Sequence, residues 1–253
     1  MKVALVEFLN AYPLYFALQK NIIKHNFEFY SYPPSVCARL LRDKKVDVGN
    51  VPIIEYAKGN YKIIKDCCIA SNKEVKSVVL FLNKPINSVR KVKLDSNSNT
   101  SVALTKILFR FKYNITVDYA YDGYADCELV IGDKALKRIK ENENAKRLDL
   151  AVEWNRFTGL PFVFAAWLSN IETDEKTKEL FIKSKEWGKS NIDIICESAN
   201  ALNLISKDEC LSYLRNNISY DLDEHKIESI KQFLFYAKQC GIIDDNPELK
   251  FTC

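Results

Sequence analysis

The sequence predicts an α/β protein with two lobes, on three observations. Strand-like and helix-like segments alternate from the N-terminus, as in sheets whose strands are joined by helices. A second alternating series begins near Lys84, and the apolar run 162–168 carries the chain back to the first. After Thr173 the sequence mixes charged and apolar residues at helical spacing, which predicts a helical C-terminal tail. We therefore expect a ligand cleft between two lobes, formed by residues 1–82 with 167–253 and by residues 83–166.

Each expected element is assigned from its pattern of apolar residues. Short apolar runs predict strands, with parallel pairing in the first half of the chain, at 2–8, 27–32, 46–51, 61–70, 77–82, 92–95, 116–120, 128–131 and 162–168. Apolar residues at helical spacing, or a helix-opening proline, predict helices at 13–20, 35–42, 52–56, after 96–101, and at 175–190, 192–203, 207–216 and 223–240.

Composition excludes several classes of protein. The chain has 253 residues, 47% of them hydrophobic, and its apolar runs are too short to span a membrane. The first residues do not resemble a secretory signal, because Glu7 interrupts the apolar run and no small-residue cleavage site follows. The 37 basic and 33 acidic residues form no basic block, so we expect no nucleic-acid partner and no membrane insertion.

Cysteines, histidines and glycines carry further expectations. The eight cysteines form no Cys-x-x-Cys pair, so we expect reduced thiols and a cytoplasmic location. His25 and His225 lie among charged residues, and no Cys, His and carboxylate cluster has metal-ligand spacing. With 7 glycines and no glycine-rich phosphate loop, the sequence predicts neither a metal nor a nucleotide cofactor.

Three predicted helix starts are candidate anion sites, because a helix N-terminus presents free N–H groups and partial positive charge. One is Asn10 with Pro13, one is Asn50 with Pro52, and the third is the polar run Ser96–Ser101. For Asn10 taken alone, helix capping is favoured over substrate binding. For the Ser96–Ser101 run, a satisfied cap and a carboxylate site are equally supported.

Two further polar residues adjoin predicted strands. Ser77 precedes the strand expected to leave the first lobe; an isolated serine there is more often structural, and no nucleophile elbow or neighbouring histidine accompanies it. Asp133 follows Gly132 at the end of a strand and is either a helix cap or a polar cleft residue.

Taken together, a set of motifs over about residues 1–170 resembles the chorismate dehydratases, which share a family with the 1,4-dihydroxy-6-naphthoate synthases. The motifs are Phe8-Leu9-Asn10-Ala11-Tyr12-Pro13-Leu14, Asn50-Val51-Pro52-Ile53-Ile54-Glu55-Tyr56, Val75-Lys76-Ser77-Val78, Ser98-Asn99-Thr100-Ser101-Val102-Ala103-Leu104, Ile131-Gly132-Asp133 and Gly159-Leu160-Pro161-Phe162-Val163-Phe164-Ala165. The resemblance implies a type-2 periplasmic-binding-protein architecture in a cytosolic enzyme of menaquinone biosynthesis by the futalosine route. The sequence departs from the family at Ile53, where a serine is expected.

The resemblance implies a lyase that removes water from chorismate to give 3-[(1-carboxyvinyl)oxy]benzoate without a cofactor. Asn10 and Ser77 are then the expected catalytic residues, and the expected substrate-binding residues are Tyr12, Pro52, Ser98, Thr100, Ser101, Gly132 and Asp133. The motifs offer no clear protein base, so the enolpyruvyl carboxylate of the substrate is the expected proton acceptor, with Glu55 as the protein alternative. The alternatives are a 1,4-dihydroxy-6-naphthoate synthase, which requires a histidine in the cleft, and a non-catalytic binding protein for a small carboxylate. The sequence does not predict an oligomeric state, or whether Lys76 or Arg39 contacts the carboxylates.

Overall fold

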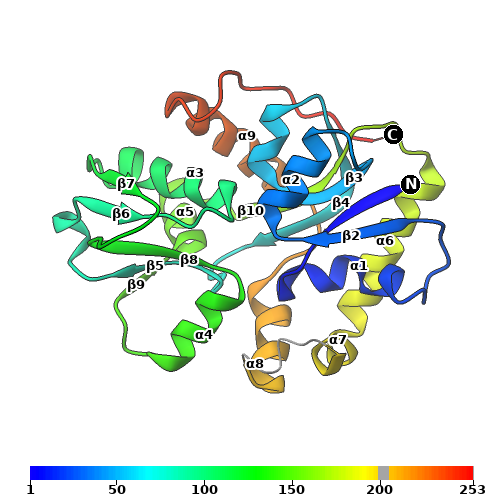
Figure 1. The fold of residues 1–253 in the computed structure, drawn as a ribbon, viewed down its shortest axis with the longest axis horizontal. Coiled ribbons are helices and arrows are strands. Elements are labelled where there is room, and N and C mark those ends of the chain that lie inside the picture. The colour runs from blue at the N-terminus through cyan, green and yellow to red at the C-terminus, as the bar shows by residue number, and fades with distance from the viewer. Residues whose placement is uncertain (199–204, 253) are drawn as a thin grey trace.

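Two five-stranded sheets organise the protein in a computed structural model that describes residues 1–198 and 205–252. They lie at opposite ends of the long axis (Figure 1). The first sheet has the order β2-β1-β3-β10-β4 and comprises β1 (Lys2–Val6), β2 (Glu28–Tyr32), β3 (Val48–Pro52), β4 (Lys62–Ser71) and β10 (Phe162–Ser169). The second has the order β7-β6-β8-β5-β9 and comprises β5 (Val78–Leu82), β6 (Lys91–Lys93), β7 (Asp118–Ala120), β8 (Cys127–Ile131) and β9 (Arg147–Asp149).

Both sheets are mixed, so the parallel pairing expected in the first half of the chain is confirmed for β1, β2 and β3 but not for the pairing of β4 and β5. β1 runs parallel to β2 and β3, but β10 runs antiparallel to β3 and β4. In the second sheet β5 runs antiparallel to β8 and β9. The antiparallel strands are those next to the passages between sheets, at residues 72–77 and 159–161. The lobe boundaries were expected after residues 82 and 166, whereas β5 lies in the second sheet and all of β10 lies in the first, so the chain passes between the sheets earlier than expected.

Helices cover the faces of both sheets (Figure 1). They are α1 (Tyr12–Gln19), α2 (Pro34–Arg42), α3 (Asn99–Ile107), α4 (Asp133–Glu141), α5 (Leu150–Thr158), α6 (Glu175–Ser190), α7 (Ile192–Ser198), α8 (Lys207–Ser212) and α9 (Glu224–Gln239). Short 3-10 segments occupy Leu9–Ala11, Ile53–Lys58 and Ile86–Ser88, and wider π-helical turns occupy Leu108–Lys112 and Tyr213–Asn217. The predicted helical tail is confirmed, although part of the helix expected at 192–203 lies outside the described residues. No helix within the described ranges is long and apolar enough to cross a membrane.

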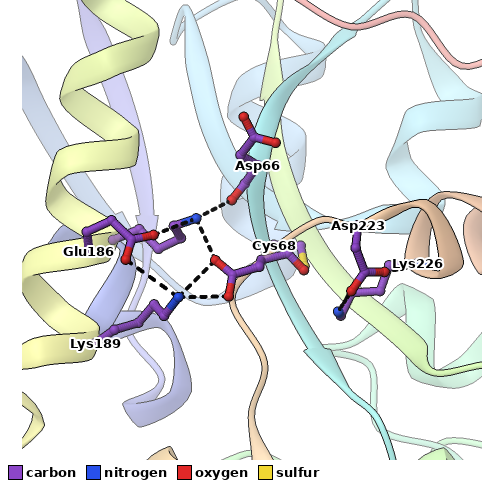
Figure 2. Close-up of polar contacts among 8 residues, drawn as sticks. Asp66, Cys68, Glu186, Lys189, Asp223 and Lys226 are labelled. Atoms are coloured by element: carbon purple, nitrogen blue, oxygen red, sulfur yellow. Dashed lines mark hydrogen bonds and ion pairs between the residues drawn. The ribbon is translucent and has the colours of Figure 1, made fainter.

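Helix α6 packs closely on the start of α1, and the ion pairs of its buried Lys185 hold it beside β4. A Cβ atom at Gly188 would lie 2.0 Å from the carbonyl oxygen of Pro13, so glycine permits this approach. Lys185 is 3% exposed, and its Nζ donates to the carbonyl oxygen of Asp66 and to Asp221 Oδ1, both at 2.7 Å. Figure 2 shows Glu186 and Lys189 in the same cluster, beside β4. These contacts hold α6 and the segment before α9 against the first sheet.

A disulfide joins Cys196 of α7 to Cys210 of α8, so the expectation of eight reduced cysteines is wrong for this pair. The packing of α7 against α8 brings their Cα atoms to 6.0 Å, within the range that a disulfide spans. The two cysteines are 14 residues apart and belong to no recognisable motif, so the sequence alone does not indicate this disulfide. The other described cysteines are free thiols, at positions 37, 67, 68, 127 and 240, and Cys253 lies outside the described residues.

Candidate active site

A cavity of about 50 Å³ lies between the two lobes. Its lining comes from both sheets and from the turns that follow their strands: Val6, Phe8, Asn10, Pro34, Asn50, Pro52, Ile69, Ser77, Val78, Ser98, Ser101, Ile131, Gly132, Phe164 and Ala165. Serines and asparagines supply its polar side chains. Among the described residues, none that lines it carries an ionisable side chain. The described lining therefore offers hydrogen bonds and helix-end dipoles but no charged group.

Ser77 reaches the cavity from a tight turn that precedes β5. Lys76 has a positive φ of 60°, and the N–H of Ser77 donates to the carbonyl oxygen of Val75 at 2.7 Å, which makes a strained three-residue turn. The carboxylate of Asp149 holds this turn by accepting from the N–H groups of Val75 at 3.0 Å and Lys76 at 2.7 Å. Burial raises the pKa of Asp149 to about 6, although these N–H donors oppose the shift. Strained backbone of this kind is typical of functional sites.

Tyr213 orients Ser77 by a hydrogen bond from outside the cavity lining, and the sequence analysis did not identify this residue. Its side chain is 3% exposed, and its hydroxyl donates to Ser77 Oγ at 2.7 Å. Burial raises the pKa of Tyr213 above its usual range, although the side chains of Ser77 and Asn10 beside its hydroxyl oppose the shift. The phenol is therefore neutral and joins the two residues predicted to be catalytic. It lies 136 residues beyond Ser77 in a tail whose pattern indicates only helix, so no local signal identified it.

The N-terminus of α3 brings Ser98 and Ser101 to the cavity. Within the polar run that was expected to cap this helix, Ser98 is the N-cap: its Oγ accepts from the N–H of Ser101 at 3.3 Å, and its hydroxyl donates to Ser101 Oγ at 2.7 Å. Thr100 is placed differently. Its Oγ1 accepts from the N–H of Ile54 in the other lobe at 3.2 Å, and its side chain is not part of the lining. In this structure Thr100 holds the lobes together.

The remaining predicted residues divide between the cavity and its surroundings. Asn10 and Pro52 line the cavity, whereas Tyr12 lies outside the lining and packs on Tyr15 at 5.6 Å between ring centroids. Asp133 lies at the start of α4, where its Oδ1 accepts from the N–H of Leu9 at 3.4 Å. Burial raises the pKa of Asp133 to about 6. Asp133 thus links the lobes beside the cavity and does not line it.

Gly132 lets the two lobes approach closely. Its φ of 63° and ψ of −145° belong to a region that is accessible almost only to glycine. A Cβ atom at this position would lie 3.0 Å from Cε1 of Phe8, which belongs to the opposite lobe. The predicted role of Gly132 therefore has a steric basis in the contact between the lobes.

The charged residues considered from the sequence do not reach the cavity. Glu55 is fully buried, and its two carboxylate oxygens each accept from Arg42 at 2.7 Å. Ile53 lies in the apolar core and contributes nothing to the lining. Lys76 and Arg39 do not line the cavity. Within the described parts of the chain, no group of three or more His, Cys, Asp or Glu residues is arranged to hold a metal ion.

The chain matches a sequence model of a protein family described as menaquinone biosynthesis, over residues 1–239. The chain belongs to this family. A chorismate dehydratase of Campylobacter jejuni is 34% identical over 164 residues, which are 63% of this chain and 63% of that protein. A chorismate dehydratase of Thermus thermophilus is 29% identical over 190 residues, covering 64% of this chain and 67% of that protein. The match thus spans less than two thirds of the Campylobacter relative.

Solved structures confirm the periplasmic-binding-protein fold. A protein of Archaeoglobus fulgidus superposes with a TM-score of 0.76 at 14% identity, covering 96% of this chain and 98% of that one. The periplasmic aliphatic sulphonate binding protein of Escherichia coli superposes with a TM-score of 0.63 at 13% identity, covering 97% and 89%. At these identities the likeness concerns the fold alone.

Proposed function

We propose that this member of the menaquinone biosynthesis family dehydrates chorismate to 3-[(1-carboxyvinyl)oxy]benzoate, in the cytoplasm and without a metal or cofactor. The observation that carries the proposal is a cavity between the lobes that is lined by hydroxyl and amide groups and by no ionisable side chain among the described residues. The relatives named chorismate dehydratase support the choice of substrate.

Two hydrogen-bonded pairs of hydroxyl groups, Tyr213 with Ser77 and Ser98 with Ser101, suit the carboxylates of the substrate. Tyr213 donates to Ser77, and Ser98 donates to Ser101, while no described residue accepts the hydroxyl hydrogen of Ser77 or Ser101. Each pair therefore ends in a donor that is free for a ligand. Chained hydrogen bonds strengthen one another, and carboxylates accept hydrogen bonds without donating any. The N-terminus of α3 adds its partial positive charge beside Ser101.

The elimination then proceeds with the substrate as its own base. The enolpyruvyl carboxylate takes the proton from C3, and the electron pair of that bond enters the ring. The C4–O bond breaks, the hydroxide takes the proton from the new carboxylic acid, and water leaves. Asn10, Ser77 and the α3 terminus orient the two carboxylates and stabilise the charge that spreads into the ring carboxylate.

The lobes must separate to admit the substrate. A cavity of about 50 Å³ is smaller than the roughly 300–1,000 Å³ of typical small-molecule sites. The structure therefore represents a closed arrangement, held by the contacts of Phe8, Thr100 and Asp133 between the lobes. Closure around the substrate excludes water and completes the site.

The test is turnover of chorismate by the purified protein in the presence of a chelator, with the product identified by mass and by its aromatic absorbance. The proposal predicts the loss of one water, and a decrease in kcat/KM of about 100-fold for Ser77→Ala and for Asn10→Ala. Ser184→Ala is the matched control, because Ser184 is fully buried in α6 and does not line the cavity. Binding of chorismate without turnover would instead support the non-catalytic binding protein, and wild-type turnover by both site variants would overturn the site.

A further inference from the structure

One polar side chain in the cavity has no hydrogen-bond partner among the residues that the structure describes. Asn50 lies on β3, the middle strand of the first sheet, between β1 and β10. It is 0% exposed and lines the cavity. Neither its Nδ2 nor its Oδ1 has a hydrogen-bond partner among the described residues. Buried amides in proteins are nearly always hydrogen-bonded, so a fully orphaned one at a cavity points to a partner that is not part of the protein.

The other polar residues of the cavity differ from Asn50 in this respect. Ser77 is hydrogen-bonded to Tyr213, and Ser98 to Ser101. Further buried polar groups without partners, such as Ser71 on β4, lie outside the lining. Asn50 is thus the one lining residue, within the described residues, whose polar side-chain atoms are buried and have no hydrogen-bond partner.

The chemistry of the amide selects one group on the substrate. A carboxamide both donates and accepts, whereas the two carboxylates and the ether oxygen of chorismate can only accept. The C4 hydroxyl alone can satisfy both atoms of Asn50. We propose, on the basis of the function proposed above, that Asn50 binds the C4 hydroxyl, which is the leaving group of the dehydration. Its Oδ1 accepts the hydroxyl hydrogen, and its Nδ2 donates to the hydroxyl oxygen.

This contact strengthens as the reaction proceeds. When the C4–O bond breaks, its electron pair goes to the departing oxygen, and the N–H of Asn50 stabilises the charge that develops there. The oxygen then takes the proton that the enolpyruvyl carboxylate removed from C3 and leaves as water. Asn50 is therefore a residue that distinguishes the hydroxylated substrate from the aromatic product, which lacks this hydroxyl. Ser77 and Asn10 remain for the carboxylates, which substrate and product share.

Asn50→Leu tests the assignment, because leucine has the same branched arrangement of side-chain heavy atoms and no polar atoms. We expect kcat/KM for chorismate to fall by about 100-fold, while the Kd for 3-[(1-carboxyvinyl)oxy]benzoate changes by less than about twofold. Thermal stability should stay unchanged or rise, because the substitution removes two unpaired buried groups. Asn50→Ala serves in the same way if leucine does not fit the site.

Two comparisons make the result specific. Ser77→Ala should weaken the binding of the product, because it acts on a carboxylate, and Ser71→Ala should change neither kcat/KM nor product binding. If Asn50→Leu kept wild-type turnover, or weakened substrate and product equally, the assignment to the hydroxyl would be wrong. Failure of the wild type to dehydrate chorismate would overturn the proposed function itself, so the two failures are distinguishable.

Discussion

Removal of one phenolic hydroxyl should uncouple the two residues predicted to be catalytic. In Tyr213→Phe, Ser77 loses its donor at 2.7 Å, and Asn10 loses the hydroxyl beside it. A buried hydrogen bond contributes about 1 kcal/mol net, so the free energy of unfolding should fall by about 1 kcal/mol. For a chain of this size, that loss lowers Tm by about 2–4 °C.

The effect on catalysis should exceed the effect of instability. Because the Ser77 hydroxyl can then rotate away from the ligand, we expect kcat/KM to fall by about 10- to 100-fold. The assay is chorismate turnover at a temperature where both proteins are fully folded. A double-mutant cycle with Ser77→Ala separates positioning from packing, because Tyr213→Phe should cost almost nothing once Ser77 is absent.

Tyr220→Phe is the matched control. Tyr220 is 3% exposed like Tyr213, but its hydroxyl has no hydrogen-bond partner within the described residues. Its removal should leave kcat/KM unchanged and stability equal or higher. Equal losses in the two tyrosine variants, or additive losses of Tyr213→Phe and Ser77→Ala, would refute the positioning role.

Three other predictions concern closure, pH and the disulfide. In Gly132→Ala, backbone strain of about 1–3 kcal/mol and the 3.0 Å approach to Phe8 should disfavour the closed form, with a higher KM and a lower kcat/KM in steady-state kinetics. Since burial raises the folded pKa of Asp133 to about 6, the native state retains a proton that the unfolded chain releases near pH 4, and stability falls as pH rises through this window. The free energy of unfolding, measured in urea at pH about 4 and about 7, should therefore decrease less between these two values in Asp133→Asn than in the wild type. Reduction of the Cys196–Cys210 bond should lower the free energy of unfolding by about 3 kcal/mol, measured by thermal unfolding with and without reductant.

Each of these has a result that would contradict it. Gly159 is the control for Gly132, because it has a φ of 77° but nothing lies within 4 Å of an added Cβ, so Gly159→Ala should affect stability alone. If the two alanine variants had equal kinetic effects, the contact of Gly132 with Phe8 would not be the cause of the loss of activity. An Asp133→Asn variant with the same pH dependence as the wild type would remove Asp133 as its source. Identical unfolding curves with and without reductant would mean that the Cys196–Cys210 bond does not stabilise the fold.

Local patterns predicted most of the elements and a polar cap within Ser96–Ser101, because strand alternation, helical spacing and capping act within a few residues. The helices expected at 175–190 and 223–240 correspond to α6 and α9. The mixed pairing of the sheets was not predicted, because strand direction depends on how the chain passes between lobes. The Cys196–Cys210 disulfide likewise arises only once α7 packs on α8.

The site was predicted in part, for a related reason. Motifs show which polar residues gather at strand ends, but only the packed lobes decide where each side chain is directed. Thr100 is bonded to the backbone of the opposite lobe, whereas Ser101, its neighbour in the same motif, lines the cavity. Tyr213 comes from a helical segment that is distant in the sequence. Asn50 is recognised as a candidate ligand-binding residue only from the structure, where its side chain has no hydrogen-bond partner among the described residues.

The central claim is that the substrate removes its own proton, because no described residue that lines the cavity has an ionisable side chain. The pH dependence of kcat tests this claim most directly. Carboxylates of the substrate are fully ionised above pH about 6, so kcat of the wild type should stay constant from pH about 7 to about 9. Glu55→Gln should show the same flat profile, at a rate within about twofold of the wild type if the variant folds. A limb in the wild-type profile within this range, abolished in Glu55→Gln, would assign the proton to a protein base and contradict the account.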